Sequence, residues 1–478
     1  MASPALAGAG AASPRADGGS QPPAERESWA YWLLASAVAA AYATAFLGTF
    51  QFDDWRAIVN EPRVQSIHAW WGSMPGIRPL LKASYAVNWA SGLGLGGFHA
   101  VNVGIHLANA FLAYSLFRRL GPPRPGAALL GALLFALHPA QTEAVTYLSG
   151  RSSSLSAAFA LASVVTWLAR GGPRPRLARA VSPLLLLASL LVKESAIVLP
   201  LSLVLLEAAF GPRPLRLRAV LRSTAAHWIV LGLWLAAFLA SPTYQQMFER
   251  SLRLRPPGAN VLTHVHGLAW LSEQVLRFDL LNADPALPVL RTLTPTVAIE
   301  GAALLSALGL GLLGRRRPLG FAVSWFLLWL PASGWLLPRA EAASDRQLYL
   351  ALLGPAWLAG RAIASLSPRL RVATAAGLVA WLGCATAARS LVYSDEVRFW
   401  EDVVEKSPEN ARAYNNLGFA LARRGDAPRA EGAFLRALEV DPTLARARVN
   451  LRLLQEGEPL APASPGEERR LPRPSPSR

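Results

Sequence analysis

The sequence predicts an all-α polytopic membrane protein, a bundle of about eleven transmembrane helices followed by a short soluble helical segment. Of its 478 residues, 53% are hydrophobic and only 16% are charged. Apolar runs close to the ~20 residues needed to cross a bilayer recur between residues 29 and 390. The net charge of +17 lies in short clusters between these runs. That distribution indicates membrane topology and argues against a nucleic-acid-binding surface.

Each apolar run is a predicted span. The predicted spans are 29–48, 97–117, 127–146, 152–169, 181–192, 195–210, 223–240, 297–314, 318–337, 347–365 and 372–390. Lys193 and Glu194 interrupt the long apolar run 181–210. We expect a tight outward turn there, between two short or tilted helices, because burying both ions inside one helix would cost more free energy.

Arginines cluster in alternate loops, at 118–126, 170–180, 211–222, 315–317 and 369–371. Because basic loops stay in the cytoplasm, the intervening acidic loops are expected to face outward. The long loops 49–96 and 241–296 are among them, and an odd number of spans places the C-terminal segment on the same side. Loop 241–296 contains an amphipathic stretch, which predicts re-entrant or interfacial helices.

The ends of the chain differ from the membrane domain, 29–390, in composition. Residues 1–28 are rich in Ala, Gly, Pro and Ser and are predicted to be disordered. They do not resemble a signal peptide, because no convincing cleavage site follows the first apolar run. The tail 457–478, rich in Pro, Glu, Arg and Ser, is also predicted to be disordered.

The soluble segment 395–456 carries a 34-residue period typical of tetratricopeptide repeats. The matching positions are Trp400 with Phe434, Pro408 with Pro442, Asn416 with Asn450 and Leu417 with Leu451. About one and a half repeats are fewer than normally stand alone. The segment is therefore expected to contact the membrane domain, a partner protein or another copy of the chain.

Asp53 and Asp54 directly follow the first apolar run. Two adjacent carboxylates at the end of a membrane span cost free energy, so their presence there indicates a functional role. A carboxylate beside the lipid and reachable from water can take a proton from an acceptor hydroxyl. We therefore predict that the pair includes a catalytic base, with Asp54 preferred over Asp53. The alternative is an ordinary solvated loop end.

Other polar residues fall on the same predicted outer face: Arg78, His138, Glu143, Arg151, Lys193, Glu194, Asp345 and Arg346. Carboxylates beside fixed cations suit transfer of a sugar from a lipid phosphate, with the cations stabilising the departing phosphate oxygens. Arg346 is the first candidate for that phosphate, and Lys193 and Arg151 follow. Alternatively, each of these residues is an interfacial side chain or a helix cap.

No metal or cofactor is predicted. His99 and His106 share a face of the second span, and His264 and His266 lie in the loop 241–296. A zinc site needs three or four such ligands brought together, so helix packing explains these histidines better. The single cysteine, Cys384, excludes an intrachain disulfide.

Taken in order, these motifs resemble one family. They are Phe52-Asp-Asp-Trp-Arg56, Arg78-Pro79, Phe98-His-Ala-Val-Asn102, Leu137-His-Pro139, Thr142-Glu143, Gly150-Arg151, Lys193-Glu194 and Asp345-Arg-Gln-Leu-Tyr349. The set is similar to the transmembrane-and-tetratricopeptide-repeat protein O-mannosyltransferases, which are C-type glycosyltransferases. The resemblance runs from about residue 30 to 455 and implies the C-type bundle for this chain.

The resemblance implies a polyprenyl-phosphate sugar donor, usually with mannose, and transfer with inversion to Ser or Thr of an exported protein. It also implies that the Asp53-Asp54 pair includes the base and that Arg346 matches the family's arginine near the late tyrosine. The chain departs from the family in Asp345, where Glu is common, and in its very short repeat array. Its composition suggests a high-GC bacterium, hence an inner-membrane protein with a periplasmic C-terminus, or the endoplasmic reticulum if the source is eukaryotic.

Two other functions stay open from the sequence. One is a related transferase or ligase that acts on a glycan or lipid acceptor. The other is a non-catalytic membrane scaffold that presents the tetratricopeptide helices to a protein partner. A scaffold would not need Asp53, Asp54, Lys193 and Arg346 on one face. Their predicted placement there favours the enzyme.

Overall fold

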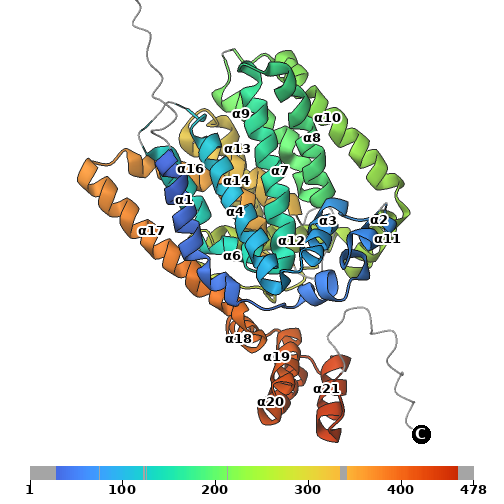
Figure 1. The fold of residues 1–478 in the computed structure, drawn as a ribbon. Helices are drawn as coiled ribbons and strands as arrows, with labels where there is room; N and C mark the ends of the chain where they lie inside the picture. Colours follow the sequence, from blue (N-terminus) through green and yellow to red (C-terminus); the bar gives the residue numbers. More distant parts are fainter. Residues whose placement is uncertain are drawn as a thin grey trace, which may run out of the picture.

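The computed structural model describes residues 28–460 except 75, 122, 123, 125, 213 and 334–341. This part of the chain is helical and contains no strand, which confirms the predicted all-α class. The segments predicted to be disordered, 1–28 and 457–478, lie almost wholly outside the described residues. Figure 1 shows a helical bundle with a group of C-terminal helices at one end.

Residues 334–337 of the predicted span 318–337 lie outside the described residues, but helices are present in each segment predicted to span the membrane. They are α1 (Ser28–Ala41) continued by η2 (Ala43–Leu47), α4 (Gly94–Phe117), α5 (Ala127–Ala136), α7 (Arg151–Leu168), α8 (Pro175–Val192), α9 (Leu199–Phe210), α10 (Leu217–Ala240), α13 (Pro295–Leu313), α14 (Pro318–Trp329), α16 (Leu353–Ala364) and α17 (Pro368–Leu391).

Fewer of these helices can cross a membrane than the eleven predicted. Among the described residues seven are long and apolar enough, and an eighth is if α5 and the bent continuation Pro139–Val145 count as one span. Of the remaining three, α9 and α16 have 12 residues each, and α14 is continued to give the apolar helix Pro318–Ala332. At 1.5 Å per residue, these helices reach about 18 to 23 Å, short of the ~30 Å hydrocarbon core.

The centre of the bundle depends on close backbone contact between α5 and α16. A Cβ on Gly360 would lie 2.5 Å from the backbone nitrogen of Gly131, so α16 tolerates no side chain at that position. Small residues at such a crossing let two membrane helices approach closely. α5 also packs against α4, and α7 packs against α4 and α8.

Shorter helices lie at the end of the bundle where α4 begins. The loop after η2 contains α2 (Ile67–Gly72) and α3 (Pro79–Ala90). The predicted helices of loop 241–296 are present as α11 (Pro242–Leu254) and α12 (Pro257–Glu273). Figure 1 shows α2, α3 and α11 close together at this end of the molecule.

The C-terminal segment consists of α18 (Glu396–Lys406), α19 (Ala411–Arg423), α20 (Ala427–Val440) and α21 (Ala445–Glu456), each packed on the next. Gly418 of α19 admits the ring of Phe434 from α20, since a Cβ at Gly418 would lie 2.7 Å from that ring. Asn450 donates a hydrogen bond to Asn415 at 3.1 Å. Assignment of these helices as tetratricopeptide repeats stays a prediction.

Candidate active site

Residues 51–54 form a tight turn, here called the acidic turn, directly after the first span. Phe52 takes the left-handed conformation with a φ of 39°, which is strained for a bulky side chain. The carboxylate of Asp54 accepts hydrogen bonds from the backbone N–H of Ser149 at 2.7 Å and of Gln51 at 3.1 Å. These two bonds join the turn to the segment before α7 and stabilise the strained backbone.

The two carboxylates of the acidic turn have different surroundings. Asp54 is fully buried, whereas Asp53 is half-buried and its backbone N–H donates to the hydroxyl of Tyr147 at 2.9 Å. Burial raises the pKa of Asp54 from 3.8 to about 7, although its hydrogen bonds to Gln51 and Ser149 oppose that rise. A substrate therefore reaches Asp53 more readily than Asp54.

Glu143 and Arg346 form a second cluster. Glu143, on α6 (Thr142–Val145), is buried and accepts hydrogen bonds from the Ser344 hydroxyl at 2.7 Å and from the backbone N–H of Arg346 at 2.8 Å. Its carboxylate also lies 3.6 Å from Nε of Arg346, whose side chain is 12% exposed. These contacts hold the start of the late short helix η11 (Asp345–Gln347) against the bend after α5.

Asp345 has a different ionic partner, Arg389 of α17, which in turn contacts the C-terminal segment. Its carboxylate is buried and lies 3.9 Å from Nη2 of Arg389, whose Nη1 contacts Asp402 of α18 at 2.5 Å. Lys406 contacts the same Asp402 at 2.6 Å. Burial, and secondarily the negative charge of Glu143, raise the pKa of Asp345 well above its usual value.

Arg78 and Glu194 are partners. The guanidinium of Arg78 makes a forked contact with the Glu194 carboxylate, at 3.0 Å from Nε and 2.7 Å from Nη2. Arg78 has a φ of 52°, and its backbone N–H contacts the hydroxyl of Tyr244 at 3.4 Å. The pair therefore joins α3 to the turn after α8 and to α11.

The other two candidate cations are more deeply placed. Lys193 is buried, and its ammonium donates to the hydroxyl of Ser153 at 2.7 Å. Arg151 is fully buried, and its three nitrogens donate to oxygens of Asn102, Ser84 and Phe98. Contacts of this kind hold the start of α7 against α3 and α4.

His138 connects two segments that are distant in sequence. Its Nδ1 accepts from the backbone N–H of Ala140 at 3.2 Å, and its Nε2 lies 3.0 Å from the carbonyl oxygen of Val275. Its ring packs edge-on against Phe278 with 5.0 Å between centroids. His138 therefore connects the bend after α5 to the segment that follows α12.

Electrostatics connect the acidic turn with the Glu143–Arg346 cluster. Burial raises the pKa of Tyr147 well above its usual value, the charges of Asp53 and Asp54 raise it further, and the charge of Arg346 lowers it. The pKa of Arg78 is raised: burial and, to a smaller extent, the charge of Arg346 lower it, but the carboxylate of Glu194 outweighs them. The acidic turn, Arg346 and Arg78 thus lie within electrostatic range of one another at one end of the bundle.

Some residues of this region carried no signal in the sequence. Tyr147 and Ser149 contact the acidic turn from 94 and 95 positions along the chain. Tyr393 accepts hydrogen bonds through its carbonyl from the backbone of Thr49 at 3.1 Å and the side chain of Gln51 at 3.2 Å. Tyr147 and Ser149 both lie between the Thr142-Glu143 and Gly150-Arg151 motifs, but spacing alone could not place them beside Asp53 and Asp54.

Histidines of the spans serve packing in the structure. Nδ1 of His106 lies 2.6 Å from the hydroxyl of Tyr349, and its Nε2 lies 2.9 Å from the carbonyl of Ala136. His99 contacts the carbonyl of Gly48 at 3.1 Å. Within the described residues, no group of three or more His, Cys, Asp or Glu side chains is placed to hold a metal ion.

The apolar helices, with ionic clusters gathered at one end of their bundle, define a multi-pass membrane protein. The chain is 33% identical over 165 residues to protein O-mannosyl-transferase TMTC4 of Homo sapiens, which covers 28% of this chain and 22% of that protein. It is 32% identical over 219 residues to protein O-mannosyl-transferase TMTC1 of Homo sapiens, covering 39% and 25%. Against protein O-mannosyl-transferase F38B6.6 of Caenorhabditis elegans, identity is 24% over 435 residues, covering 84% and 61%.

No protein-family model matches the chain. The relatives found nevertheless share one name, and the alignment with the nematode protein runs along most of this chain. The chain is therefore related to the TMTC-type protein O-mannosyl-transferases, which confirms the resemblance found in its motifs. It spans less than two thirds of the length of each of these three relatives.

Proposed function

We propose that this chain is a membrane glycosyltransferase that moves a sugar from a polyprenyl-phosphate donor to Ser or Thr hydroxyls of protein acceptors on the non-cytoplasmic face. The observation that carries the proposal is the half-buried Asp53 beside the buried Asp54, at the same end of the bundle as Arg346. The names of the relatives support mannose as the sugar and protein as the acceptor.

The reaction needs one base. The acceptor oxygen forms a bond to the anomeric carbon while the bond from that carbon to the phosphate oxygen breaks, and the hydroxyl proton passes to a carboxylate. Asp53 is the better placed of the pair for this proton because it is partly exposed. Asp54, buried and bonded to two backbone N–H groups, is a positioning residue that holds Asp53 in place.

The leaving group needs a cation, because negative charge builds on the phosphate oxygens as the sugar departs. Of the three candidates, the side chain of Arg346 is 12% exposed, whereas Lys193 and Arg151 are buried. A guanidinium matches phosphate with two parallel hydrogen bonds. The proposal therefore assigns the phosphate to Arg346, oriented by Glu143, and gives Lys193 and Arg151 supporting roles.

The test is transfer by the purified full chain in nanodiscs, with polyprenyl-phosphate mannose and a Ser/Thr peptide. If Asp53 is the base, Asp53→Asn should lower turnover by about 10²–10⁴ while leaving membrane insertion unchanged. The matched control is Asp279→Asn, which removes a carboxylate paired with Arg277 and 60% exposed in the loop 241–296.

Full activity of Asp53→Asn would remove Asp53 from the mechanism. A wild-type protein that transfers the sugar to glycan or lipid acceptors but not to peptides would keep the reaction and change the acceptor class. Absence of transfer to any acceptor, from any polyprenyl-phosphate sugar, would reject the enzymatic function and favour a scaffold.

A further inference from the structure

Arg389 of α17 lies between the candidate active site and the C-terminal helices. Its Nη1 donates to the carboxylate of Asp402 on α18 at 2.5 Å, and its Nη2 lies 3.9 Å from the carboxylate of Asp345 on η11. The side chains of Arg389 and Asp345 are 7% and 2% exposed, so this contact is shielded from water. One guanidinium thus connects a C-terminal helix to the short helix that also carries Arg346.

The backbone that carries Arg389 is held on both sides. Thr386 donates its hydroxyl to the carbonyl of Leu137 at 2.7 Å, and the hydroxyl of Ser390 lies 3.0 Å from that of Thr146, directly after α6. All four of these partners are buried. The position of Arg389 relative to α6 is therefore fixed by contacts of its neighbours.

The short helix η11 has contacts on two sides. Glu143 of α6 accepts from the Ser344 hydroxyl at 2.7 Å and from the backbone N–H of Arg346 at 2.8 Å. Arg389 contacts Asp345, the residue between them. A helix of three residues is too short to be stable alone, so side-chain contacts such as these hold η11 and the backbone of Arg346 in place.

The charge state of Asp345 depends on ions from both sides. Burial and the charge of Glu143 raise the pKa of Asp345, and the charges of Arg389 and Lys406 oppose that rise. Removal of the guanidinium would leave Asp345 buried beside Glu143 without its nearest cation, which is costly. Asp345 would then take a proton or move toward water, and either change would alter the contacts that hold η11.

We propose that Arg389 is a positioning residue for Arg346. Because Arg389 contacts Asp402 and Asp345 together, the place of Arg346 depends on the docking of α18. This inference rests on the proposed function, in which Arg346 binds the donor phosphate. It adds that the C-terminal helices complete the phosphate site, so a chain with α18 undocked transfers sugar poorly.

The first measurement does not need sugar transfer. Hydrogen–deuterium exchange of the full chain in nanodiscs, read by mass spectrometry over residues 342–348, reports how often η11 opens. Arg389→Gln should raise the exchange rate there at least about tenfold, since loss of a contact between charged groups changes an equilibrium by about that factor. Arg389→Lys keeps the charge and should give an intermediate rate. Unchanged exchange in α5 and α16 checks that the bundle stays folded.

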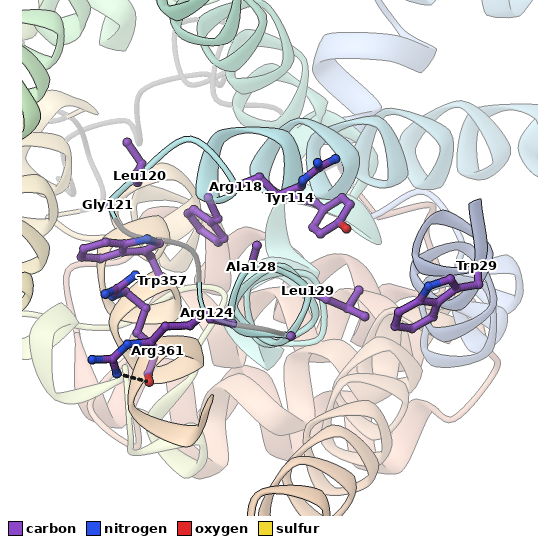
Figure 2. A pocket seen from close by; sticks show the side chains of 13 residues that line it. Trp29, Tyr114, Arg118, Leu120, Gly121, Arg124, Ala128, Leu129, Trp357 and Arg361 are labelled. Atoms are coloured by element: carbon purple, nitrogen blue, oxygen red, sulfur yellow. Dashed lines mark hydrogen bonds between the residues drawn. The ribbon is translucent and has the colours of Figure 1, made fainter. Parts of the chain in front are cut away.

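Two other arginines are matched controls. Arg398→Gln removes an exposed cation of α18 whose described side-chain contacts are with oxygens of Leu391 and Ser394. Arg124→Gln removes an arginine at the far end of α4, where Figure 2 shows it bonded to the carbonyl of Arg361 beside a cavity of about 530 Å³. In both controls η11 should exchange as in wild type.

Asp402→Asn is the second test variant, and it carries the test if Arg389→Gln does not insert. It releases the guanidinium from α18 but keeps Arg389, so exchange of η11 should rise by a smaller factor. In sugar transfer, Arg389→Gln should lower kcat about tenfold. It should cause no further loss in the Arg346→Ala background, because its effect passes through Arg346.

Wild-type exchange of η11 in Asp402→Asn would overturn the link to α18, and wild-type exchange in Arg389→Gln would overturn the whole inference. An equal rise in Arg398→Gln would overturn it too, as would losses of kcat that multiply in the Arg346→Ala background. If wild type transfers no sugar, the proposed function fails, whereas the exchange rates still decide whether Arg389 holds η11.

Discussion

At the residue scale, the acidic turn places one carboxylate where ionisation costs free energy. Asp54 is removed from water, yet both of its oxygens receive backbone N–H groups that suit an ion. Burial is the larger effect, so its pKa rises to about 7. When Asp54 is protonated, one of its oxygens carries a hydrogen and faces a backbone N–H, so one of the two hydrogen bonds is lost.

The proposal predicts a pH dependence with opposite signs for activity and stability. Below pH 7, Asp54 is protonated, one bond to the turn is lost, and kcat/KM should fall along an acid limb centred near pH 7. Stability should change the other way. The folded pKa lies above the unfolded value, so the stabilisation present at low pH is lost as pH rises from about 4 to 7.

The measurements are a pH–rate profile in nanodiscs and unfolding midpoints at several pH values. Asp54→Asn should flatten both curves in this range and lower activity at all pH values, because an amide cannot accept from both N–H groups. Since Asp53 and Asp54 interact, any fitted pKa belongs to the pair. A profile that is flat between pH 5.5 and 8.5 for wild type would exclude this role of Asp54.

Arg346 gives a second residue-scale prediction. Arg346→Lys keeps the charge but loses the forked geometry and the contact of Nε with Glu143, 3.6 Å away, so kcat should fall. Arg346→Ala should fall further, by about 10²–10³, the loss typical of one transition-state donor. Arg277→Lys and Arg277→Ala are matched controls, because Arg277 is 59% exposed and pairs only locally with Asp279 in its described contacts. Equal kcat in all four variants would make Arg346 an interfacial anchor.

Sequence could name these residues but not their partners. Asp53, Asp54, Arg78 and Arg346 stood out because ions beside apolar runs are expensive. Arg78 pairs with Glu194, 116 positions away, and Arg346 pairs with Glu143, 203 positions away. Such pairings follow from helix packing, which one sequence does not encode in its spacing. Asp54 is buried and Asp53 is only half-buried because of the conformation of the acidic turn, which the sequence does not predict.

At the element scale, the C-terminal helices are part of the acidic turn's surroundings. Trp400 of α18 packs edge-on against Phe52 with 5.4 Å between centroids, and Arg412 of α19 lies 5.5 Å from the same ring. The carbonyl of Tyr393, just before α18, receives two hydrogen bonds from residues 49 and 51. The C-terminal segment therefore contacts the membrane domain, which was one of the three expectations for it.

Removal of the Trp400 ring should loosen the acidic turn. Trp400→Ala empties a buried site, which typically costs about 3–5 kcal/mol of stability, and it frees the strained Phe52. We expect kcat to fall at least tenfold in protein that still inserts and still binds the donor. Leu435→Ala, at a 47% exposed position of α20, is the control and should leave kcat unchanged. Wild-type kcat in Trp400→Ala would separate the C-terminal helices from the site.

Element boundaries show what periodicity and hydropathy can and cannot give. α8 begins at Pro175, six residues before the predicted span, and accommodates Pro183 inside the helix. The predicted single span 127–146 is instead bent by 52° after α5, at His138-Pro139. Pro139 marks a break in the helix whereas Pro183 does not, and both the presence and the direction of a bend depend on tertiary packing.

At the scale of the whole molecule, one contact supports a predicted topological relation without a count of the spans. The backbone N–H of Thr49, directly after the first span, donates to the carbonyl of Tyr393, directly after α17, at 3.1 Å. Both residues lie at the ends of their spans, so the contact favours the prediction that residues 49–96 and the C-terminal segment share one face of the membrane. The contact is the same whether eleven helices cross or only the seven or eight that are long enough alone.

The orientation of that face is the last prediction. The arginine clusters lie in the loops at the opposite face, so the acidic turn and the C-terminal helices should face the non-cytoplasmic side. Alkaline phosphatase fused to the C-terminus of the full chain in a bacterial inner membrane should be active, and green fluorescent protein should stay dark there. Sandwich fusions in the 315–317 loop should give the reverse pattern. A fluorescent C-terminal fusion would place Tyr393, and with it Thr49 and Asp53, in the cytoplasm. Sugar transfer to exported proteins at the acidic turn would then be impossible.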